Sequence, residues 1–170
     1  MHKLAFNLLL FLLFIFEGTI FSYFSLDQYG QSIVIAPRLS LILIIFISIF
    51  NHRRYGLIYG VILGVFYDII YGKGLGIHLG GLAAIGYFSG WLMYFFHPSF
   101  IIFVIIEIMG LFTYEIYLYG IHRLFQLFST PFQWTFLHYL LPTLLFNVII
   151  AILSYKLLNQ IIKEDEEEHA

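Results

Sequence analysis

The chain has 170 residues, of which 61% are hydrophobic and 11% are charged, and its formal net charge is −2. A soluble domain carries about 25% charged residues, and a soluble core of this size could not bury so much apolar surface. These values exclude an ordinary soluble domain, and the small net charge argues against a nucleic-acid partner. The absence of cysteine excludes disulfides, thiolate metal sites and cysteine nucleophiles. We therefore predict an all-α, polytopic protein whose main solvent is membrane lipid.

About six apolar segments approach the roughly 20 residues that a helix needs to cross a bilayer. We expect one transmembrane domain over residues 1–163, followed by an acidic cytoplasmic tail at 164–170. The first segment begins like a signal peptide but has no Ala-x-Ala-like cleavage site, so we interpret it as an uncleaved helix. The expected spans cover approximately residues 4–22, 37–51, 55–71, 75–96, 99–119 and 136–158.

The connection at residues 120–135 contains an amphipathic pattern. Apolar residues recur there at the i, i+3, i+4 and i+7 positions of a helix, namely Ile121, Leu124, Phe125 and Phe128. This spacing predicts a short helix lying in the membrane interface. The alternative is that the fifth span continues into this region.

Lysine and arginine near the span ends indicate the orientation, because they are enriched on the cytoplasmic side. With the N-terminus inside, the cytoplasmic side receives Lys3, Arg53, Arg54, Lys156 and Lys163. The outer side then receives Arg38, Lys73 and Arg123. This bias favours a multi-pass protein with both termini in the cytoplasm.

Glycines recur at every fourth position of the third span, at Gly56, Gly60 and Gly64, and Asp68 takes the next place in the series. Steps of four residues form one slanting stripe on a helix. A stripe of small residues lets a second helix approach closely in a membrane. The fourth span is also rich in small residues, so we expect these two spans to pack together and the stripe to shape a partner-binding fold. The glycines of the fourth segment that we assign to packing or partner binding are Gly76, Gly86 and Gly90.

Asp68 lies near the outer end of the third span by this topology. An ionised carboxylate facing lipid is costly, so we expect Asp68 to face protein or water. Three roles are compatible with its position: capping or bracing of the glycine-rich turn that follows, contact with a partner or ligand, and proton relay.

Other polar residues within the spans indicate internal bracing. Arg38 follows Pro37 at the start of the second span, and Glu107 and Glu115 share roughly one face of the fifth. An Arg38–Glu115 pair is geometrically possible, and we interpret it as structural rather than as a transport site because pairing makes such charges tolerable in lipid. Glu17 is a further charge within an apolar segment. In the sixth span, Pro142 frees a backbone carbonyl one turn earlier, and Asn147 can hydrogen-bond across helices.

No constellation typical of an enzyme is present in the sequence. The seven histidines occur singly, without a His-x3-His or His-Glu-x2-His spacing, so we predict no metal site. The glycines of the third span lack the Lys-Ser/Thr ending of a phosphate-binding loop. We expect a protein without catalytic residues and without a cofactor.

Four short motifs resemble the MreD family of rod shape-determining proteins. They are Pro37-Arg38-Leu39, the series Gly60-x3-Gly64-x3-Asp68 followed by Leu75-Gly76, Glu115 with Tyr117 and Gly120, and Pro142-Thr143 with Asn147. Their order and spacing agree with the family over essentially the whole chain.

The resemblance implies a bundle similar to the substrate-binding S components of energy-coupling transporters, located in the bacterial inner membrane. It also implies a non-enzymatic scaffold of the cell-elongation complex that binds MreC, a single-span protein with a large external domain. Indirect partners would be MreB filaments and the peptidoglycan synthases, a RodA-type polymerase and a penicillin-binding protein. The alternative that the resemblance leaves open is an S component of an energy-coupling vitamin or metal transporter.

Overall fold

The computed structural model describes residues 11–19, 33–71, 76–126 and 131–167, with side chains described as far as residue 160. The described chain is almost entirely helical, which confirms the all-α fold class. A helix at residues 11–19 is followed by the elements α2 (Leu39–Phe50), α3 (Arg53–Ile70), α4 (Ile77–Trp91), the 3-10 turn η2 (Leu92–Tyr94), α5 (Phe100–Leu124), α6 (Phe132–Thr135), the π-helical turn η3 (Phe136–Leu140) and α7 (Leu141–Glu167).

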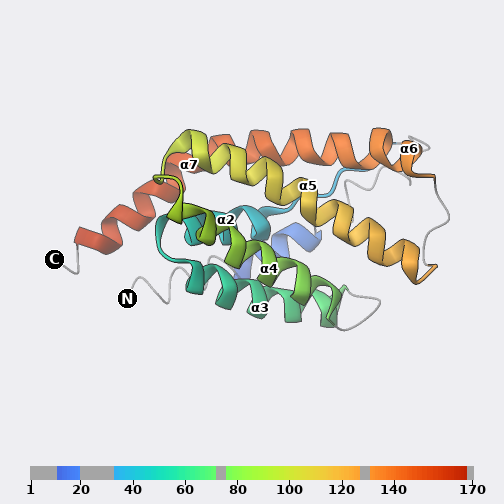
Figure 1. Ribbon diagram of the computed structural model, residues 1–170, viewed down its shortest axis with the longest axis horizontal. Helices are drawn as coiled ribbons and strands as arrows, with labels where there is room; N and C mark the ends of the chain where they lie inside the picture. Colours follow the sequence, from blue (N-terminus) through green and yellow to red (C-terminus); the bar gives the residue numbers. More distant parts are fainter. Residues whose placement is uncertain (1–10, 20–32, 72–75, 127–130, 168–170) are drawn as a thin grey trace.

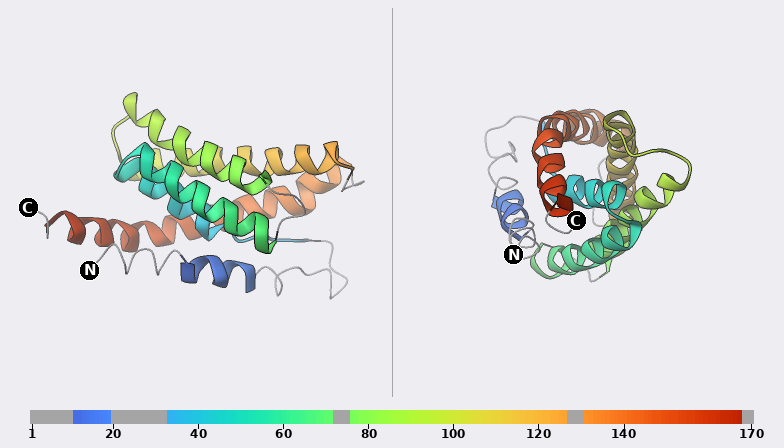
Figure 2. Two further views of the ribbon diagram at one scale, coloured as in Figure 1. Left: turned by 90° about the horizontal axis from the view of Figure 1, so that it is seen from below. Right: turned by 90° about the vertical axis from the view of Figure 1, so that its left-hand side faces the viewer.

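α2 is the central helix of the bundle. Every residue from Ser40 to Ile49 is buried, and the end-on view in Figure 2 shows α2 surrounded by the other helices. In Figure 1, α3 and α4 lie on one side of it and α5 and α7 on the other. A helix that is apolar on all faces must be covered by other helices or by lipid, and in this bundle the run Leu41–Ile47 is buried by other parts of the chain.

α2 alone is about 18 Å long, too short for a hydrocarbon core of about 30 Å. An extended segment, residues 33–38, precedes it. Pro142 removes the N–H that would have bonded the carbonyl of His138, and the backbone N–H of Val34 donates to that carbonyl instead, at 2.9 Å. Non-helical backbone is tolerated at membrane depth where protein groups satisfy it. The carbonyl that Pro142 was predicted to free thus anchors the segment that leads into α2.

Several helices in the structure begin or end at other residues than the expected spans. α5 continues as one helix to Leu124, so the separate interfacial helix expected at residues 120–135 is wrong for residues 120–124 and the alternative, an extended fifth span, is correct there. The last helical unit begins at Phe132 rather than at residue 136, and α7 continues through Glu167 into the acidic tail. The expected ends were set where the sequence stops being apolar. A helix can continue beyond that point because its backbone hydrogen bonds do not require apolar side chains. Residues 4–10 and 20–22 of the first span, Lys3, Lys73, Leu75 and residues 127–130 lie outside the described ranges.

Two helical units of the described chain are long and apolar enough to cross a membrane by length and composition. They are Phe100–Leu124 and Phe132–Gln160. These two units fit a membrane protein.

Candidate functional site

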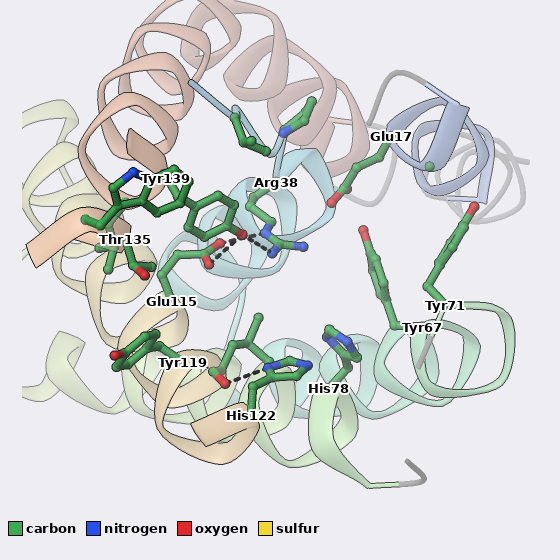
Figure 3. A pocket seen from close by; sticks show the side chains of 16 residues that line it. Glu17, Arg38, Tyr67, Tyr71, His78, Glu115, Tyr119, His122, Thr135 and Tyr139 are labelled. Atoms are coloured by element: carbon green, nitrogen blue, oxygen red, sulfur yellow. Dashed lines mark hydrogen bonds and ion pairs between the residues drawn. The ribbon is translucent and has the colours of Figure 1, made fainter. Parts of the chain in front are cut away.

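Arg38 is the centre of a polar cluster at the end of the bundle where α2 begins and α5 ends, which we call the cavity end. Its Nε donates to Glu115 Oε1 at 2.8 Å, and its Nη2 donates to the hydroxyl of Tyr139 at 3.1 Å. The Tyr139 hydroxyl in turn donates to Glu115 Oε2 at 2.9 Å. These bonds, drawn in Figure 3, join the start of α2 to α5 and η3. The Arg38–Glu115 pair considered possible from the sequence is therefore present.

The segment that carries Arg38 is also fixed through its backbone. Asn147 Oδ1 accepts from the Arg38 N–H at 2.6 Å, while Asn147 Nδ2 donates to the Ala36 carbonyl at 2.8 Å. Thr143 Oγ1 accepts from the Ala36 N–H at 3.1 Å. Asn147 and Thr143 are fully buried on α7. Asn147 thus makes long-range hydrogen bonds, but to the extended segment before α2 rather than to another helix, and Pro37 lies within that segment.

Glu17 caps the start of α2. Its Oε2 accepts from the backbone N–H of Ser40 at 2.9 Å, and its side chain is only 3% exposed. A helix begins with unpaired N–H groups and a partial positive charge, both of which a carboxylate satisfies. The sequence shows this charge within an apolar segment but predicts no role for it. The available signal was a carboxylate within an apolar segment, which must face protein.

Asp68 caps α4 from the last turn of α3. Its Oδ2 accepts from the N–H groups of Gly76 at 2.7 Å and Leu79 at 3.2 Å, and its Oδ1 accepts from His78 at 2.8 Å. Gly76 has a positive φ of 96° and no atom within contact distance of an added Cβ. Gly76 was expected to pack against a helix, but the structure shows it forming the backbone turn that places α4 on Asp68. Of the roles considered for Asp68, this geometry shows capping, here of the N-terminal end of α4.

Replacing Asp68 with asparagine is expected to destabilise the bundle by about 2 kcal/mol, the value typical of a hydrogen bond to a charged group. The asparagine has one acceptor oxygen, so its amide nitrogen would face N–H donors at the start of α4. The midpoint of thermal unfolding in detergent should fall accordingly. An unchanged midpoint would show that the carboxylate is not needed to close the α3–α4 turn.

The glycine stripe lies inside the interface between α3 and α4, the most extensive contact between two elements of the chain. An added Cβ on Gly60 would lie 2.6 Å from the Leu82 carbonyl oxygen and 2.8 Å from Ala83 Cα. Gly64 faces the backbone of Leu79 in the same way. The two backbones are in direct contact, so any side chain at these positions must separate them.

The glycines of α4 extend this contact toward α2. Gly56 and Gly86 face each other's carbonyl groups, and the hydroxyl of Ser48 on α2 donates to the Gly86 carbonyl. Gly90 packs against Ser48 and the backbone of Arg53. The close packing expected for these spans is present within the chain. The stripe is consequently buried, and a partner could reach only the surfaces that it supports.

A cavity of about 580 Å³ lies beside the Arg38 cluster. Its wall combines Glu17, Arg38 and Glu115 with histidines and aromatic rings, and Figure 3 shows these side chains around the hollow. No motif in the sequence predicts the lining of this cavity. The other lining residues are Gly18, Val34, Pro37, Tyr67, Tyr71, His78, Leu118, Tyr119, His122, Trp134, Thr135, Tyr139 and Leu140.

The chain matches the family model described as rod shape-determining protein MreD over residues 2–163. The chain belongs to the MreD family. It is 28% identical over 135 residues to the rod shape-determining protein MreD of Bacillus subtilis (strain 168), and this match covers 78% of each chain. No solved structure gives a significant match. The resemblance drawn from the four motifs is confirmed, and all four motifs fall within the matched residues.

MreD-family membership fits a membrane protein with a shape-determining role and gives no support for catalysis. Within the described residues, no group of three or more histidine, aspartate or glutamate side chains could hold a metal ion. The polar groups at the cavity end are bonded to one another or to helix ends. These bonds connect the start of α2 with α5, η3 and the helix at residues 11–19, and the end of α3 with the start of α4.

Glu107 does not join the Arg38 cluster, although it was expected to belong to the same polar core. Eight residues separate it from Glu115, which is about 12 Å along a helix. Glu107 is fully buried, and neither carboxyl oxygen has a hydrogen-bond partner in the described part of the chain. Sharing one helix face therefore did not bring the two carboxyl groups into one site.

Proposed function

We propose that this chain is a non-enzymatic membrane scaffold of the bacterial rod complex, binding MreC and linking peptidoglycan synthesis to cell shape. The observation that carries this proposal is the family match over residues 2–163. The internal use of the charged groups supports it: Arg38, Glu115 and Asp68 all bond to neighbouring helices. A scaffold needs a rigid bundle with an exposed face, and such bracing provides rigidity.

The proposed topology is about six membrane-crossing helices with both termini in the cytoplasm of an inner-membrane protein. Consecutive helices joined by short turns run in opposite directions, as Asn51–His52 joins α2 to α3. Arg53 and Arg54 lie at the start of α3, opposite the cavity end. From the positive-inside rule we therefore expect the cavity end to face outside. A fusion reporter on each turn would test this orientation.

We propose that MreC meets an outer face of the bundle and not the glycine stripe. On α3, the face turned away from α4 exposes a row of apolar side chains that a single-span helix could contact in lipid. Exposed aliphatic residues of α3 in this row include Leu57, Ile58, Val61, Ile62, Val65 and Ile69. The α3–α4 contact behind this row sets its shape.

The experiment that tests the scaffold is an affinity pull-down of the tagged full-length chain from native membranes in mild detergent, identified by mass spectrometry. We expect recovery of MreC together with cell-wall elongation enzymes. Depletion of the chain should also round the cells. Recovery of a membrane coupling subunit with ATPases would contradict the scaffold.

The cavity favours a second candidate, an S component that binds a vitamin or metal for an energising module. A volume of about 580 Å³ lies within the range of small-molecule sites. The same pull-down distinguishes the two candidates, because only the S component would bring down ATPases. A vitamin or metal retained by the purified protein would also favour it.

A further inference from the structure

The wall of the cavity is mostly apolar but also contains polar and charged side chains. Most of the wall is aromatic or aliphatic, including Tyr67, Tyr71, Trp134, Leu118 and Leu140. Arg38, Glu115 and Tyr139 form one hydrogen-bonded polar cluster on one side of the hollow, while Glu17, His78 and His122 lie at other points of the wall (Figure 3). A ligand that fits this wall has a long apolar part and one polar end.

The unused hydrogen-bonding capacity at the polar side consists of donors. A guanidinium has five N–H groups, and Arg38 uses one from Nε and one from Nη2. Among the described residues, Nη1 has no acceptor, and Figure 3 shows one nitrogen of the guanidinium pointing away from Glu115 toward Tyr67 and His78. Both oxygens of Glu115 already accept hydrogen bonds. The ligand should therefore offer acceptor oxygens.

The charges in this wall disfavour a small anion that has no apolar chain to offset the electrostatic repulsion. Glu17 and Glu115 supply two carboxylates in the same wall against the single guanidinium of Arg38. An ester or phosphoester oxygen carried by an apolar chain satisfies the donors, and the chain fills the aromatic part of the cavity. Transfer of that chain out of water or detergent supplies the binding free energy, at about 0.8 kcal/mol for each buried CH₂.

We propose that the cavity binds the hydrocarbon chain of a lipid, with an ester or phosphoester oxygen of that lipid accepting hydrogen bonds from Arg38. Such a lipid comes either from the bilayer phospholipids or from the polyprenyl phosphates. This inference goes beyond the proposed scaffold, since neither MreC binding nor a role in cell shape requires an occupied cavity.

Tryptophan fluorescence offers a direct test. The chain has two tryptophans: Trp134 lines the cavity, and Trp91 ends α4, about 20 Å along the helix from His78. The Trp91→Phe full-length protein in dodecyl maltoside is titrated with a phosphatidylglycerol whose chains carry bromine. We expect saturable quenching of Trp134, which would show a discrete site.

Matched variants separate the cavity from the lipid-facing surface. Val34→Phe places a ring in the cavity wall, and Val61→Phe makes the same change on the exposed face of α3. Val34→Phe should weaken the apparent affinity about tenfold, which is 1.4 kcal/mol, while Val61→Phe leaves it unchanged. Leu118→Phe fills the cavity from α5 and replaces Val34→Phe if that variant does not fold.

Competition identifies the source of the lipid. The two competitors are unbrominated phosphatidylglycerol and a polyprenyl phosphate, and each is titrated against the bound brominated lipid. The competitor that restores Trp134 fluorescence at the lower concentration identifies the class of lipid that the cavity prefers. Either result supports a lipid chain in the cavity. Quenching that never saturates, or that is equal in the cavity-filling variant and Val61→Phe, would overturn the proposal.

Discussion

Leucine in place of Gly64 is expected to destabilise the bundle by about 3 kcal/mol or more, the upper part of the range for overpacking. Even a Cβ at this position would lie 2.8 Å from the Leu79 backbone nitrogen and 3.1 Å from the His78 carbonyl oxygen. These atoms belong to the backbone of the first turn of α4, so they cannot move aside without moving that helix. The shift would also carry the N–H groups of His78 and Leu79 away from Asp68.

The Gly64 prediction is checked by the thermal unfolding midpoint in detergent and by recovery of MreC in the pull-down, both of which should fall. Gly120→Leu is the matched control, because an added Cβ on Gly120 meets no atom within 4 Å. If Gly64→Leu behaved like Gly120→Leu, the direct backbone contact between α3 and α4 would not be important for the fold.

Arg38→Gln is expected to lower the free energy of unfolding by about 3 kcal/mol, the lower end of the range for breaking a buried ion pair. The side chains of Arg38 and Glu115 are 13% and 3% exposed, so Glu115 would be left with an unpaired charge in a nearly buried position. Glu115→Gln leaves the guanidinium unpaired and should also destabilise the protein. The loss matters beyond one pair because Tyr139 bonds to both residues.

The double variant Arg38→Gln/Glu115→Gln tests whether the two residues act as a pair. We expect it to be less destabilised than the sum of the two single variants, since residues in one hydrogen-bonded network are non-additive. The measurement is the unfolding free energy in detergent for all four proteins. Strictly additive losses would mean that each residue stabilises the bundle through other contacts.

Some features of the site could be predicted because they depend on local spacing. The four-residue step from Gly56 to Gly64 predicts a close helix contact, and the structure provides its partner in α4. Pro142 lacks an N–H wherever it lies, so a free carbonyl one turn earlier follows from the sequence. The position of Asp68 just before a glycine-rich turn likewise favoured a cap.

Other features could not be predicted because they depend on where distant segments meet. Glu17 caps α2 only because the helix at residues 11–19 ends beside the N–H of Ser40. The cavity requires side chains from the starts and ends of several helices at once. Glu107 is the opposite case, because a correct local feature did not give the expected site. It shares a helix face with Glu115, but its carboxyl oxygens have no hydrogen-bond partner in the described part of the chain.

The sequence by itself determined the helical, membrane-protein character of this chain, its glycine stripe and its place in the MreD family. These properties follow from composition, from periods of four residues and from motif order, all of which are readable along one chain. Only the tertiary structure decided that Arg38 joins Glu115 across 77 positions and that Asn147 holds Ala36 across 111. The physical reason is that a buried polar group takes whichever partner the packed helices place within about 3 Å, and that proximity is a property of the whole bundle.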